Sequence, residues 1–419
     1  VIAEIHQDMK KKYSMHRLLQ GDVGSGKTIV AILSASLAVG NNSQVAIMAP
    51  TEILASQHYK SFQEELSQAR ITCCLLVGKM KKNDRLQMLS NIKNGNISVV
   101  IGTHALIQKD VVFKDLGLVI IDEQHRFGVE QRGKLTDKGS NPHFLSMTAT
   151  PIPRTLSITY MGDMDLSIID ELPKNRIPIT TKIIDKNRLP RVYSFMKKQI
   201  DLGQQCMIVY PLIEESEKSD LAAAVGMYEK LKTNTFSKYQ IGLVHGKMTP
   251  EEKKVVMQKF QKNEVNIIIS TTVIEVGIDV PNATVMLIEH AERFGLTQLH
   301  QLRGRVGRGK EKSYCILVNR GSNDVSLSRL EIMEKTNDGF KIADEDLMIR
   351  GPGDYVGYQQ SGFVKYKIAN MITDGPIIRK ARVLATKLIK KDPLLDNHYN
   401  LKNRVLNDYK DNLNLTNLN

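Results

Sequence analysis

Short apolar runs alternate with longer amphipathic stretches along most of the chain. In the first part, apolar runs predict strands at Val45–Ala49, Ser98–Thr103, Leu118–Asp122 and Phe144–Thr148. Runs of this length, separated by helical patterns, are typical of parallel strands joined by helical crossovers. We therefore predict one α/β lobe over residues 1–172, which begins with a helix over residues 1–13.

A polar break separates this lobe from a second one with the same pattern. The stretch Leu172-Pro-Lys-Asn-Arg-Ile-Pro178 contains two prolines and predicts a linker over residues 173–180. A second lobe over residues 181–320 follows, with a helix at Pro250–Lys262. Its predicted strands are Cys206–Tyr210, Ile241–Val244, Asn266–Thr271, Thr284–Glu289 and Ser313–Asn319.

Residues 321–419 have a different character. Helical periodicity predicts helices at Ser326–Lys335 and Ile377–Lys391, and the second of these is basic. Arg350-Gly-Pro-Gly353 predicts a turn, because proline and glycine both disfavour a helix interior. The last residues are rich in Asn and Leu and have weak periodicity, so their order is left open.

Composition restricts the class of protein and its partners. The net charge of +13 favours an anionic partner such as nucleic acid, although solvated lysines would give the same value. Four cysteines without a disulfide or zinc spacing indicate a reducing, cytoplasmic setting. No apolar run reaches the ~18 residues that a membrane span needs. The lack of Trp argues against nucleic-acid binding by base stacking.

A phosphate-binding loop is the strongest chemical signal in the sequence. The run after Leu18-Leu19 fits G-x-x-x-x-G-K-[ST] at every fixed position, and the apolar stretch Ile29–Val39 predicts a helix directly behind it. Lys27 would reach the β- and γ-phosphates of ATP, and Thr28 would place its hydroxyl on Mg²⁺. The predicted nucleotide-binding residues are Gly21, Asp22, Val23, Gly24, Ser25, Gly26, Lys27 and Thr28.

An acidic pair follows the apolar strand Leu118–Ile121. Asp122 would hold Mg²⁺, and Glu123 would orient and deprotonate the attacking water. A pair that merely caps a strand end is the simpler alternative. Because two similar lobes share one phosphate-binding loop, we expect the nucleotide to lie in the cleft between them.

The segment from Asp122 to Arg132 reads Asp-Glu-Gln-His-Arg-Phe-Gly-Val-Glu-Gln-Arg. It resembles motif II of superfamily 2 helicases, in the form found in RecG-type DNA helicases. Other segments resemble motifs Ia, Ib, III, V and VI of the same superfamily, namely Ala49–His58, Gly102–Ile107, Thr148–Thr155, Ser270–Asp279 and Gln301–Arg308. The resemblance runs from about Ile2 to Gly362 and implies a fold of two tandem RecA-like P-loop lobes with parallel sheets, followed by a C-terminal helical hairpin.

The resemblance also implies roles for individual residues around the nucleotide. Arg305 and Arg308, which share one face if their segment is helical, would point at the γ-phosphate and stabilise the charge of phosphoryl transfer. Together with Lys27 and Glu123 they form the predicted catalytic set. Other residues would contact the nucleotide or couple its state to lobe closure, namely Gly277, Asp279, Gln124, His125, Thr148 and Thr150.

DNA contacts are expected from both lobes. Thr51, Thr103 and Thr271 lie at strand ends, where helicases of this superfamily contact phosphates without reading sequence. Ordinary helix N-caps would place threonines at the same positions.

The segment Thr336–Gly353 with Gln360-Ser-Gly362 resembles the translocation motif shared by RecG and transcription-repair coupling factors. Arg329, Arg350 and Gln360 match its coupling residues, although Asp344 stands where the family more often has Glu.

The resemblance implies an ATP-dependent double-stranded DNA translocase that uses ATP and Mg²⁺. It would remodel stalled forks and branched recombination intermediates by fork regression and Holliday junction branch migration. We expect a monomer, with single-stranded DNA-binding protein as a cellular partner. The family's N-terminal wedge domain and upstream Gln motif have no counterpart here, so we expect ATPase activity and duplex binding with weak or no fork unwinding. A coupling-factor motor, an RNA helicase and a nucleotide-gated DNA-binding module without turnover remain alternatives.

Overall fold

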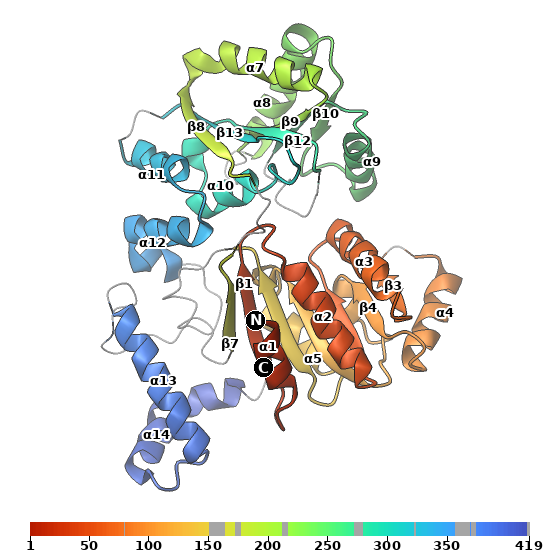
Figure 1. Ribbon diagram of the computed structural model, residues 1–419, viewed down its shortest axis with the longest axis vertical. Helices are drawn as coiled ribbons and strands as arrows, with labels where there is room; N and C mark the ends of the chain where they lie inside the picture. The colour runs from red at the N-terminus through yellow and green to blue at the C-terminus, as the bar shows by residue number, and fades with distance from the viewer. Residues whose placement is uncertain are drawn as a thin grey trace.

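Two α/β lobes are stacked on one another in the computed structural model, and helices from the C-terminal part of the chain lie beside them (Figure 1). Lobe 1 is built on a seven-stranded parallel sheet and lobe 2 on a six-stranded parallel sheet. The structure describes residues 1–78, 80–150, 164–171, 177–211, 217–271, 280–321, 324–356, 369 and 374–416.

Lobe 1 has the strand order β3-β4-β2-β5-β6-β1-β7. Its strands are β1 (His16–Gly21), β2 (Gln44–Met48), β3 (Cys73–Leu76), β4 (Val99–Gly102), β5 (Leu116–Asp122), β6 (His143–Thr148) and β7 (Asp165–Ile169). Its helices are α1 (Ile2–Met9), α2 (Lys27–Gly40), α3 (Glu52–Leu66), α4 (Lys82–Lys93) and α5 (Val129–Thr136), with the short 3₁₀ helices η1 (His104–Ile107) and η2 (Gln124–Arg126).

Both faces of this sheet are buried, because successive side chains of a strand point to opposite sides. Along β2, Val45 and Ile47 pack with α1, α2 and α3, whereas Ala46 and Met48 pack on the face that carries α4 and α5. A strand buried on both faces is apolar at every position rather than at alternate ones. This explains why short, uninterrupted apolar runs predicted the central strands correctly.

Lobe 2 has the order β10-β11-β9-β12-β13-β8. Its strands are β8 (Thr180–Asp185), β9 (Gln205–Tyr210), β10 (Ile241–Val244), β11 (Ile267–Thr271), β12 (Ala283–Ile288) and β13 (Tyr314–Asn319). Its helices are α7 (Leu189–Asp201), α8 (Glu217–Lys230), α9 (Pro250–Gln261), α10 (Leu296–Arg303) and α11 (Asp324–Lys335), with η3 (Lys186–Arg188), η5 (Leu231–Thr235) and η7 (Ala291–Arg293). Helix α9 begins as predicted, with Pro250 in its first turn and a capping box formed by Thr249 and Glu252.

The two lobes repeat one fold in detail. Both sheets place their strands in the same order, and β7 is an additional edge strand of lobe 1. The end of β5 and the end of β12 also correspond. Within two residues of each strand end comes a residue in the left-handed region, Glu123 (φ 52°) or His290 (φ 50°), followed by a 3₁₀ turn. Only lobe 1 carries the phosphate-binding loop.

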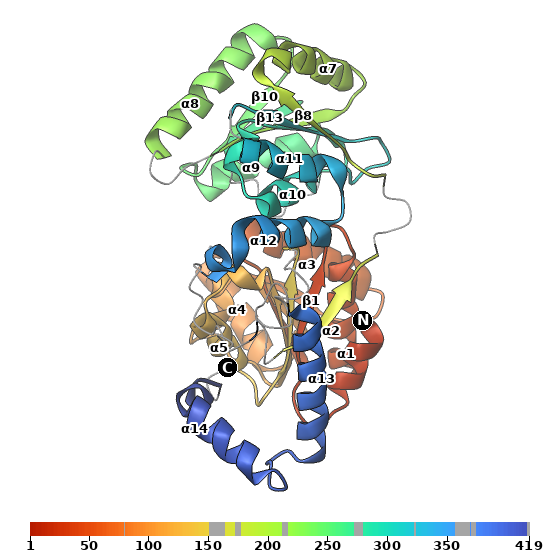
Figure 2. The same cartoon turned by 90° about the vertical axis from the view of Figure 1, so that its left-hand side faces the viewer.

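Three further helices follow lobe 2, namely α12 (Gly339–Val356), α13 (Gly375–Lys391) and α14 (Tyr399–Thr416). Helix α12 packs against α10 and α11 and lies at the level where the lobes meet (Figure 2). Helix α13 runs beside lobe 1, where the Nη2 of Arg382 donates to the carbonyl oxygen of Met164 at 2.6 Å. The C-terminal segment therefore contacts both lobes.

The turn predicted at Arg350–Gly353 is wrong, because α12 continues through these residues to Val356. The earlier part of the helix is fixed by Phe340, Ile342 and Leu347, which are buried. Once a helix is nucleated, each further residue is added at a low cost in free energy. The packing of the earlier turns therefore outweighs the low helix propensity of Gly and Pro. The weakly periodic C-terminus, for which we expected a helical tail over the end of residues 321–419, contains the helix α14.

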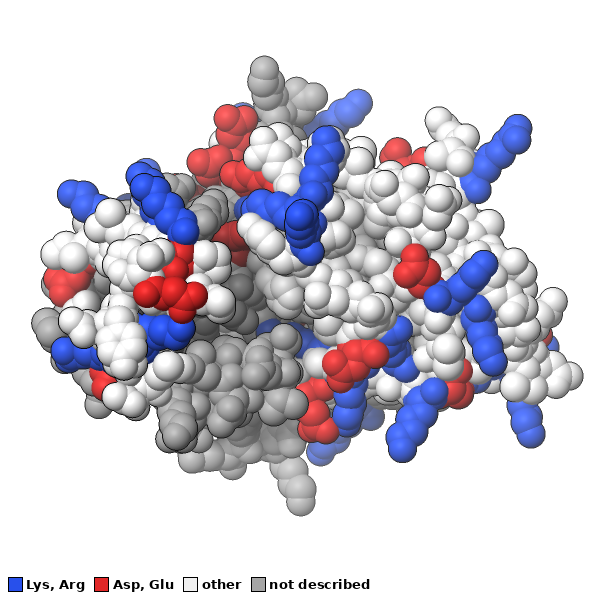
Figure 3. All heavy atoms as spheres, turned by 90° about the horizontal axis from the view of Figure 1, so that it is seen from below, with Lys and Arg blue, Asp and Glu red and all other residues white. Residues whose placement is uncertain are grey.

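The surface carries both signs of charge. On the face seen from below, Lys and Arg side chains are spread among Asp and Glu rather than gathered into one patch (Figure 3). The four cysteines are all free thiols. Among the described helices, none combines the length and the hydropathy that crossing a bilayer requires.

Candidate nucleotide site between the lobes

The phosphate-binding loop lies between β1 and α2. Strand β1 ends at Gly21 and α2 begins at Lys27, so the loop opens directly onto a helix N-terminus. Gly24 (φ 76°) and Gly26 (φ 95°) adopt left-handed backbone conformations that residues with a side chain rarely take. The Nζ of Lys27 donates to the carbonyl oxygens of Gly21 at 2.8 Å and Asp22 at 2.9 Å. This geometry is that of an anion-binding cradle.

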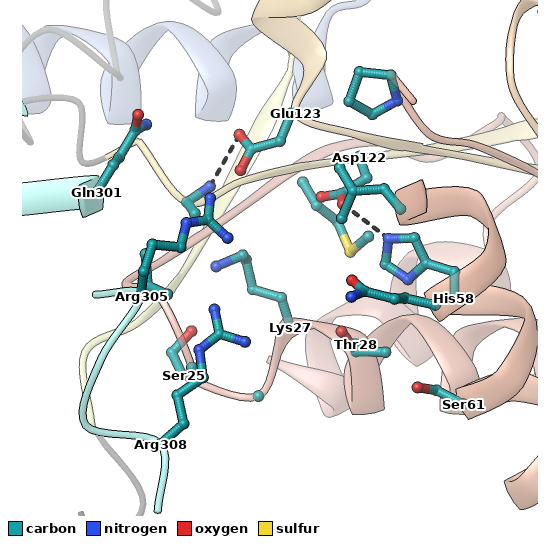
Figure 4. A pocket seen from close by; sticks show the side chains of 18 of the residues that line it. Ser25, Lys27, Thr28, His58, Ser61, Asp122, Glu123, Gln301, Arg305 and Arg308 are labelled. Atoms are coloured by element: carbon teal, nitrogen blue, oxygen red, sulfur yellow. Dashed lines mark hydrogen bonds and ion pairs between the residues drawn. The ribbon is translucent and has the colours of Figure 1, made fainter. Parts of the chain in front are cut away.

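A cavity of about 550 Å³ opens over this loop and is lined by both lobes. Figure 4 shows Lys27, Asp122 and Glu123 facing Arg305 and Arg308 across it. The cavity therefore lies in the cleft where we expected the nucleotide. Its lining includes Gly24, Ser25, Gly26, Lys27, Thr28, Asp122 and Glu123 from lobe 1, and Gln301, Arg305 and Arg308 from lobe 2.

Glu123 is held in an unusual backbone conformation at the end of β5. Its φ of 52° is rare for a residue with a side chain, and such conformations concentrate at functional sites. Its Oε2 accepts from the Oγ1 of Thr148 and from the backbone N–H of Ala149, each at 3.4 Å. Burial, and next the charge of Asp122, raise the pKa of Glu123 above its ordinary value. A carboxylate with a raised pKa is suited to act as a general base.

Asp122, the neighbouring carboxylate, is shifted in the opposite direction. Burial acts to raise the pKa of Asp122, but the hydrogen bond with His58 and the charges of His58 and Lys27 outweigh it, so the pKa is lowered. The Nε2 of His58, on α3, lies 2.8 Å from the Oδ2 of Asp122. The two shifts favour the charged form of Asp122 and the protonated form of Glu123. His58 belongs to the segment that resembles motif Ia, but we had not predicted it as a site residue.

The residues around Asp122 fit a bound Mg²⁺. The Thr28 hydroxyl and the Asp122 carboxylate line the same cavity, and both are oxygen ligands of the kind that Mg²⁺ prefers. Within the described part of the chain, no cluster of three or more His, Cys, Asp or Glu side chains could hold a metal ion. Mg²⁺ usually takes only one or two protein ligands and completes its shell with phosphates and water.

The segment of Arg305 and Arg308 is not helical, so the two arginines do not share a helical face, although both side chains line the cavity. Helix α10 ends at Arg303, and the two arginines follow in an irregular segment. Gly307 takes a left-handed conformation (φ 77°) between them. The turn at this glycine, rather than helical spacing, directs both arginines to the same site.

A chain of contacts connects the acidic pair to lobe 2. Thr148 contacts Glu123, and its Oγ1 accepts from the backbone N–H of Thr150 at 3.0 Å. The Nε2 of Gln301, on α10, then donates to the Oγ1 of Thr150 at 2.8 Å. Gln124 is buried, and its Oε1 accepts from Ser146. Gln301 is a second residue that we had not predicted, although it opens the segment that resembles motif VI.

Other predicted residues lie away from this cavity. Thr51 caps α3, because its Oγ1 accepts from the N–H of Leu54 at 3.3 Å. Thr103 and Thr271 are buried, and in the described part of the structure their hydroxyls have no hydrogen-bond partner. The Nη2 of Arg329 donates to the carbonyl oxygen of Phe294 at 2.7 Å. Gly277, Asp279, Gln360 and the side chains of His125 and Arg350 lie outside the described residues.

Three known families match the chain in sequence. The DEAD/DEAH box helicase family matches residues 2–158, and the helicase conserved C-terminal domain matches residues 187–310. The C-terminal part of domain 3 of ATP-dependent DNA helicase RecG matches residues 336–419. The three matches follow each other along the chain in the order of lobe 1, lobe 2 and the C-terminal helices.

Curated relatives agree with these matches. The ATP-dependent DNA helicase RecG of Synechocystis is 47% identical over 410 residues, which are 98% of this chain and 49% of the relative. The RecG of Aquifex aeolicus is 50% identical over 423 residues, which are 99% of this chain and 53% of the relative. The chain thus spans about half the length of the curated relatives that it matches.

Solved structures give the same assignment. A structure of RecG bound to a three-way DNA junction has a TM-score of 0.75 and 46% identity, over 90% of this chain and 49% of that one. Yeast Dbp5 bound to RNA and ADP BeF3 has a TM-score of 0.58 at 17% identity, over 91% of this chain and 93% of that one, and shows the shared fold alone. The chain therefore belongs to the RecG family of ATP-dependent DNA helicases and corresponds to the motor part of such a protein.

Proposed function

We propose that this chain is an ATP-driven double-stranded DNA translocase, the motor of a helicase that remodels stalled forks and branched recombination intermediates. One observation carries the proposal. A phosphate-binding loop and an acidic pair from lobe 1 meet two arginines from lobe 2 in one cavity. Because the site is divided between two lobes, ATP hydrolysis requires the lobes to close on each other. The hydrolysis cycle is thereby coupled to a movement of one lobe relative to the other.

Each residue has a proposed task in hydrolysis. The loop from Gly21 to Thr28 binds the phosphates, and Thr28 and Asp122 hold Mg²⁺, which neutralises developing charge when bound. The Glu123 carboxylate, positioned by Thr148 and the Ala149 N–H, accepts a proton from the attacking water.

The side chains that lobe 2 contributes are proposed to complete this site. Arg305 and Arg308 bring positive charge to the γ-phosphate. Lys27 does the same from within the loop. Because the arginines belong to the other lobe, hydrolysis would require both lobes to be in place.

Duplex and branched DNA are the proposed substrates. A relative of this family has been solved with a three-way DNA junction, and the net charge of +13 is suited to a polyanion. Thr51, whose side chain is only half-buried, remains a proposed contact with phosphates, whereas the hydroxyls of Thr103 and Thr271 are buried and do not reach the surface. Fork regression, branch migration and an association with single-stranded DNA-binding protein are proposals for the whole protein, and four free cysteines fit a reducing cytoplasmic setting.

ATP hydrolysis with and without DNA tests this proposal. We expect duplex or three-way junction DNA to stimulate turnover, and Lys27→Ala to abolish it. Stimulation should fall steeply as salt rises, because phosphate contacts release counterions. ATP turnover that is the same with and without DNA would refute the translocase and leave only a nucleotide-binding ATPase.

A further inference from the structure

A histidine from lobe 2 reaches the phosphate-binding loop of lobe 1. The Nε2 of His300, on α10, lies 2.6 Å from the Oδ1 of Asp22, the second residue of the loop. The His300 side chain is almost completely buried, with 4% of its surface exposed. The contact is thus a largely buried bridge between the two lobes beside the phosphate-binding loop.

The partner of the other ring nitrogen determines the direction of this hydrogen bond. The Nη2 of Arg303 lies 3.0 Å from the Nδ1 of His300. A guanidinium group can only donate, so in this arrangement Nδ1 accepts and Nε2 is the ring nitrogen that donates. His300 therefore donates to the Asp22 carboxylate. The same Oδ1 also accepts from the backbone N–H of Val23 at 2.6 Å, so this carboxylate braces the start of the loop.

Arg303 holds the imidazole in a rigid frame. Its side chain is buried, and its Nη1 donates to the carbonyl oxygens of Met333 at 2.8 Å and Thr336 at 2.9 Å. These bonds attach the end of α10 to the end of α11 and to the first residue of the segment that resembles the translocation motif. The ring of His300 therefore moves only when this whole corner of lobe 2 moves.

The next residue of the chain confirms how closely the lobes meet here. A Cβ atom placed on Gly304 would lie 2.9 Å from the Cβ of Val23. The end of α10 thus rests on the phosphate-binding loop, and Arg305 follows immediately. Any shift at His300 would be passed to the arginine that faces the phosphates.

We propose that His300 is a positioning residue for ATP hydrolysis, which binds the Asp22 carboxylate and so aligns Arg305 and Arg308 with the phosphate-binding loop. This rests on the proposed ATPase function. The role is distinct from that of Gln301, which contacts Thr150 on another part of the site. His300 does not line the cavity itself and acts through Asp22.

Matched variants of His300 separate this role from a packing role. His300→Gln places an amide N–H near the position of Nε2 and keeps the donor to Asp22. His300→Asn keeps an acceptor near Nδ1 for Arg303 but does not reach Asp22. We expect His300→Asn and His300→Ala to lower kcat roughly ten- to one hundred-fold, the value of a charge-assisted hydrogen bond. His300→Gln should stay within about threefold of wild type.

A double-mutant cycle with Asp22→Ala completes the experiment. If the two side chains act through each other, the double variant should lose no more kcat than the more impaired single variant. KM, and the Kd of a fluorescent ATP analogue measured by titration, should change less than about threefold in the His300 variants. The melting temperature of each variant shows that it is folded.

The opposite results would overturn the proposal. Losses that multiply in the double variant, or an active His300→Asn beside an inactive His300→Gln, would leave His300 only a packing role in lobe 2. If the wild-type chain hydrolyses ATP and either of these results is obtained, only the His300 proposal fails. If the wild-type chain does not hydrolyse ATP at all, both proposals fail.

Discussion

Two adjacent carboxylates at the end of β5 have opposite pKa shifts. Burial and the charge of Asp122 raise the pKa of Glu123. Burial also acts to raise the pKa of Asp122, but the hydrogen bond with His58 and the charges of His58 and Lys27 together outweigh it and lower that pKa. Pairs of titratable groups that are shifted apart in this way usually divide the work of catalysis. One carboxylate is suited to remain charged beside a metal ion, and the other is suited to accept a proton.

Glu123→Gln should therefore remove turnover without removing nucleotide binding. The amide is close in shape but cannot accept a proton, so we expect kcat to fall roughly 10²- to 10⁴-fold. Single-turnover ATP hydrolysis and a nucleotide-binding titration measure the two effects. Glu130→Gln, which changes an exposed carboxylate on α5, is the matched control and should leave kcat unchanged. A Glu123→Gln variant with more than about a tenth of wild-type turnover would refute the assignment.

The sequence predicted the residues whose chemistry is local and missed those whose role depends on the fold. Lys27 and Asp122 could be predicted because a loop motif and a strand end define their positions. His58, His300 and Gln301 lie within or beside segments that we had matched to motifs, yet nothing local indicates their partners. Each acts on a residue from a distant part of the chain, and only the tertiary structure brings the two together.

At the scale of elements, most central strands and the edge strand β10 were predicted, whereas the three other edge strands were not. Strands β3, β7 and β8 lie at sheet edges, where one or both faces remain partly exposed. The residues of β7 and β8 are therefore mixed, as in Thr180-Thr-Lys-Ile-Ile-Asp185, and give no continuous apolar run. Strand β3 (Cys73-Cys-Leu-Leu76) is a short apolar run that we had not assigned to a strand. β1 was only partly recognised, because buried Arg17 and Gln20 interrupt its apolar residues.

An ion pair attaches the first helix to the sheet. The Nε of Arg17, on β1, donates to the Oδ2 of Asp8, on α1, at 2.8 Å, and both side chains are buried. Burial acts to raise the pKa of Asp8, but hydrogen bonds from Lys11 and Arg17 outweigh it, so the pKa is lowered. A carboxyl with a lowered folded-state pKa stabilises the fold at pH values above its unfolded-state pKa.

Asp8→Asn should lower the free energy of unfolding of lobe 1 by about 3 kcal/mol at neutral pH, because it breaks a buried pair. The contribution of Asp8 is complete above its unfolded-state pKa, near 3.9, and is lost as the pH falls through the lower folded-state value. Urea unfolding of wild type and variant at several pH values measures this. The two curves should converge in acid, whereas a constant difference down to pH 2 would contradict the assignment.

At the scale of the whole molecule, the arrangement of the two lobes around the cavity depends on the contact between the end of α10 and the phosphate-binding loop. Sequence patterns predicted two lobes and a shared cleft, and the cavity lies where this hypothesis places it. The sequence patterns did not predict which surfaces of the two lobes are in contact. Such contacts involve few residues, and those residues do not recur at a helix or strand period in the sequence. Gly304 is an example, since its role is to leave room for Val23.

Gly304→Ala should separate the lobes at this point. Its Cβ would lie 2.9 Å from the Cβ of Val23, so the end of α10 must shift and carry Arg305 with it. We expect kcat to fall at least about tenfold, because misplacement by a fraction of an ångström already weakens transition-state contacts. Gly226→Ala on α8 is the control, since a Cβ atom added there would meet no other atom within 4 Å. Gly226→Ala should leave kcat unchanged and stabilise the helix by about 0.5–1 kcal/mol. If Gly304→Ala and Gly226→Ala had the same kcat, the contact between Gly304 and Val23 would have no role in turnover.

Displacement of the third strand from a DNA triplex tests the central claim most directly, because it reports movement along duplex DNA without requiring the duplex to be unwound. The account predicts that the chain displaces this strand only when ATP is hydrolysed, and that Glu123→Gln and Lys27→Ala do not displace it. A chain that hydrolyses ATP in the presence of duplex DNA, but leaves the triplex intact, would contradict the claim that this two-lobed site drives translocation.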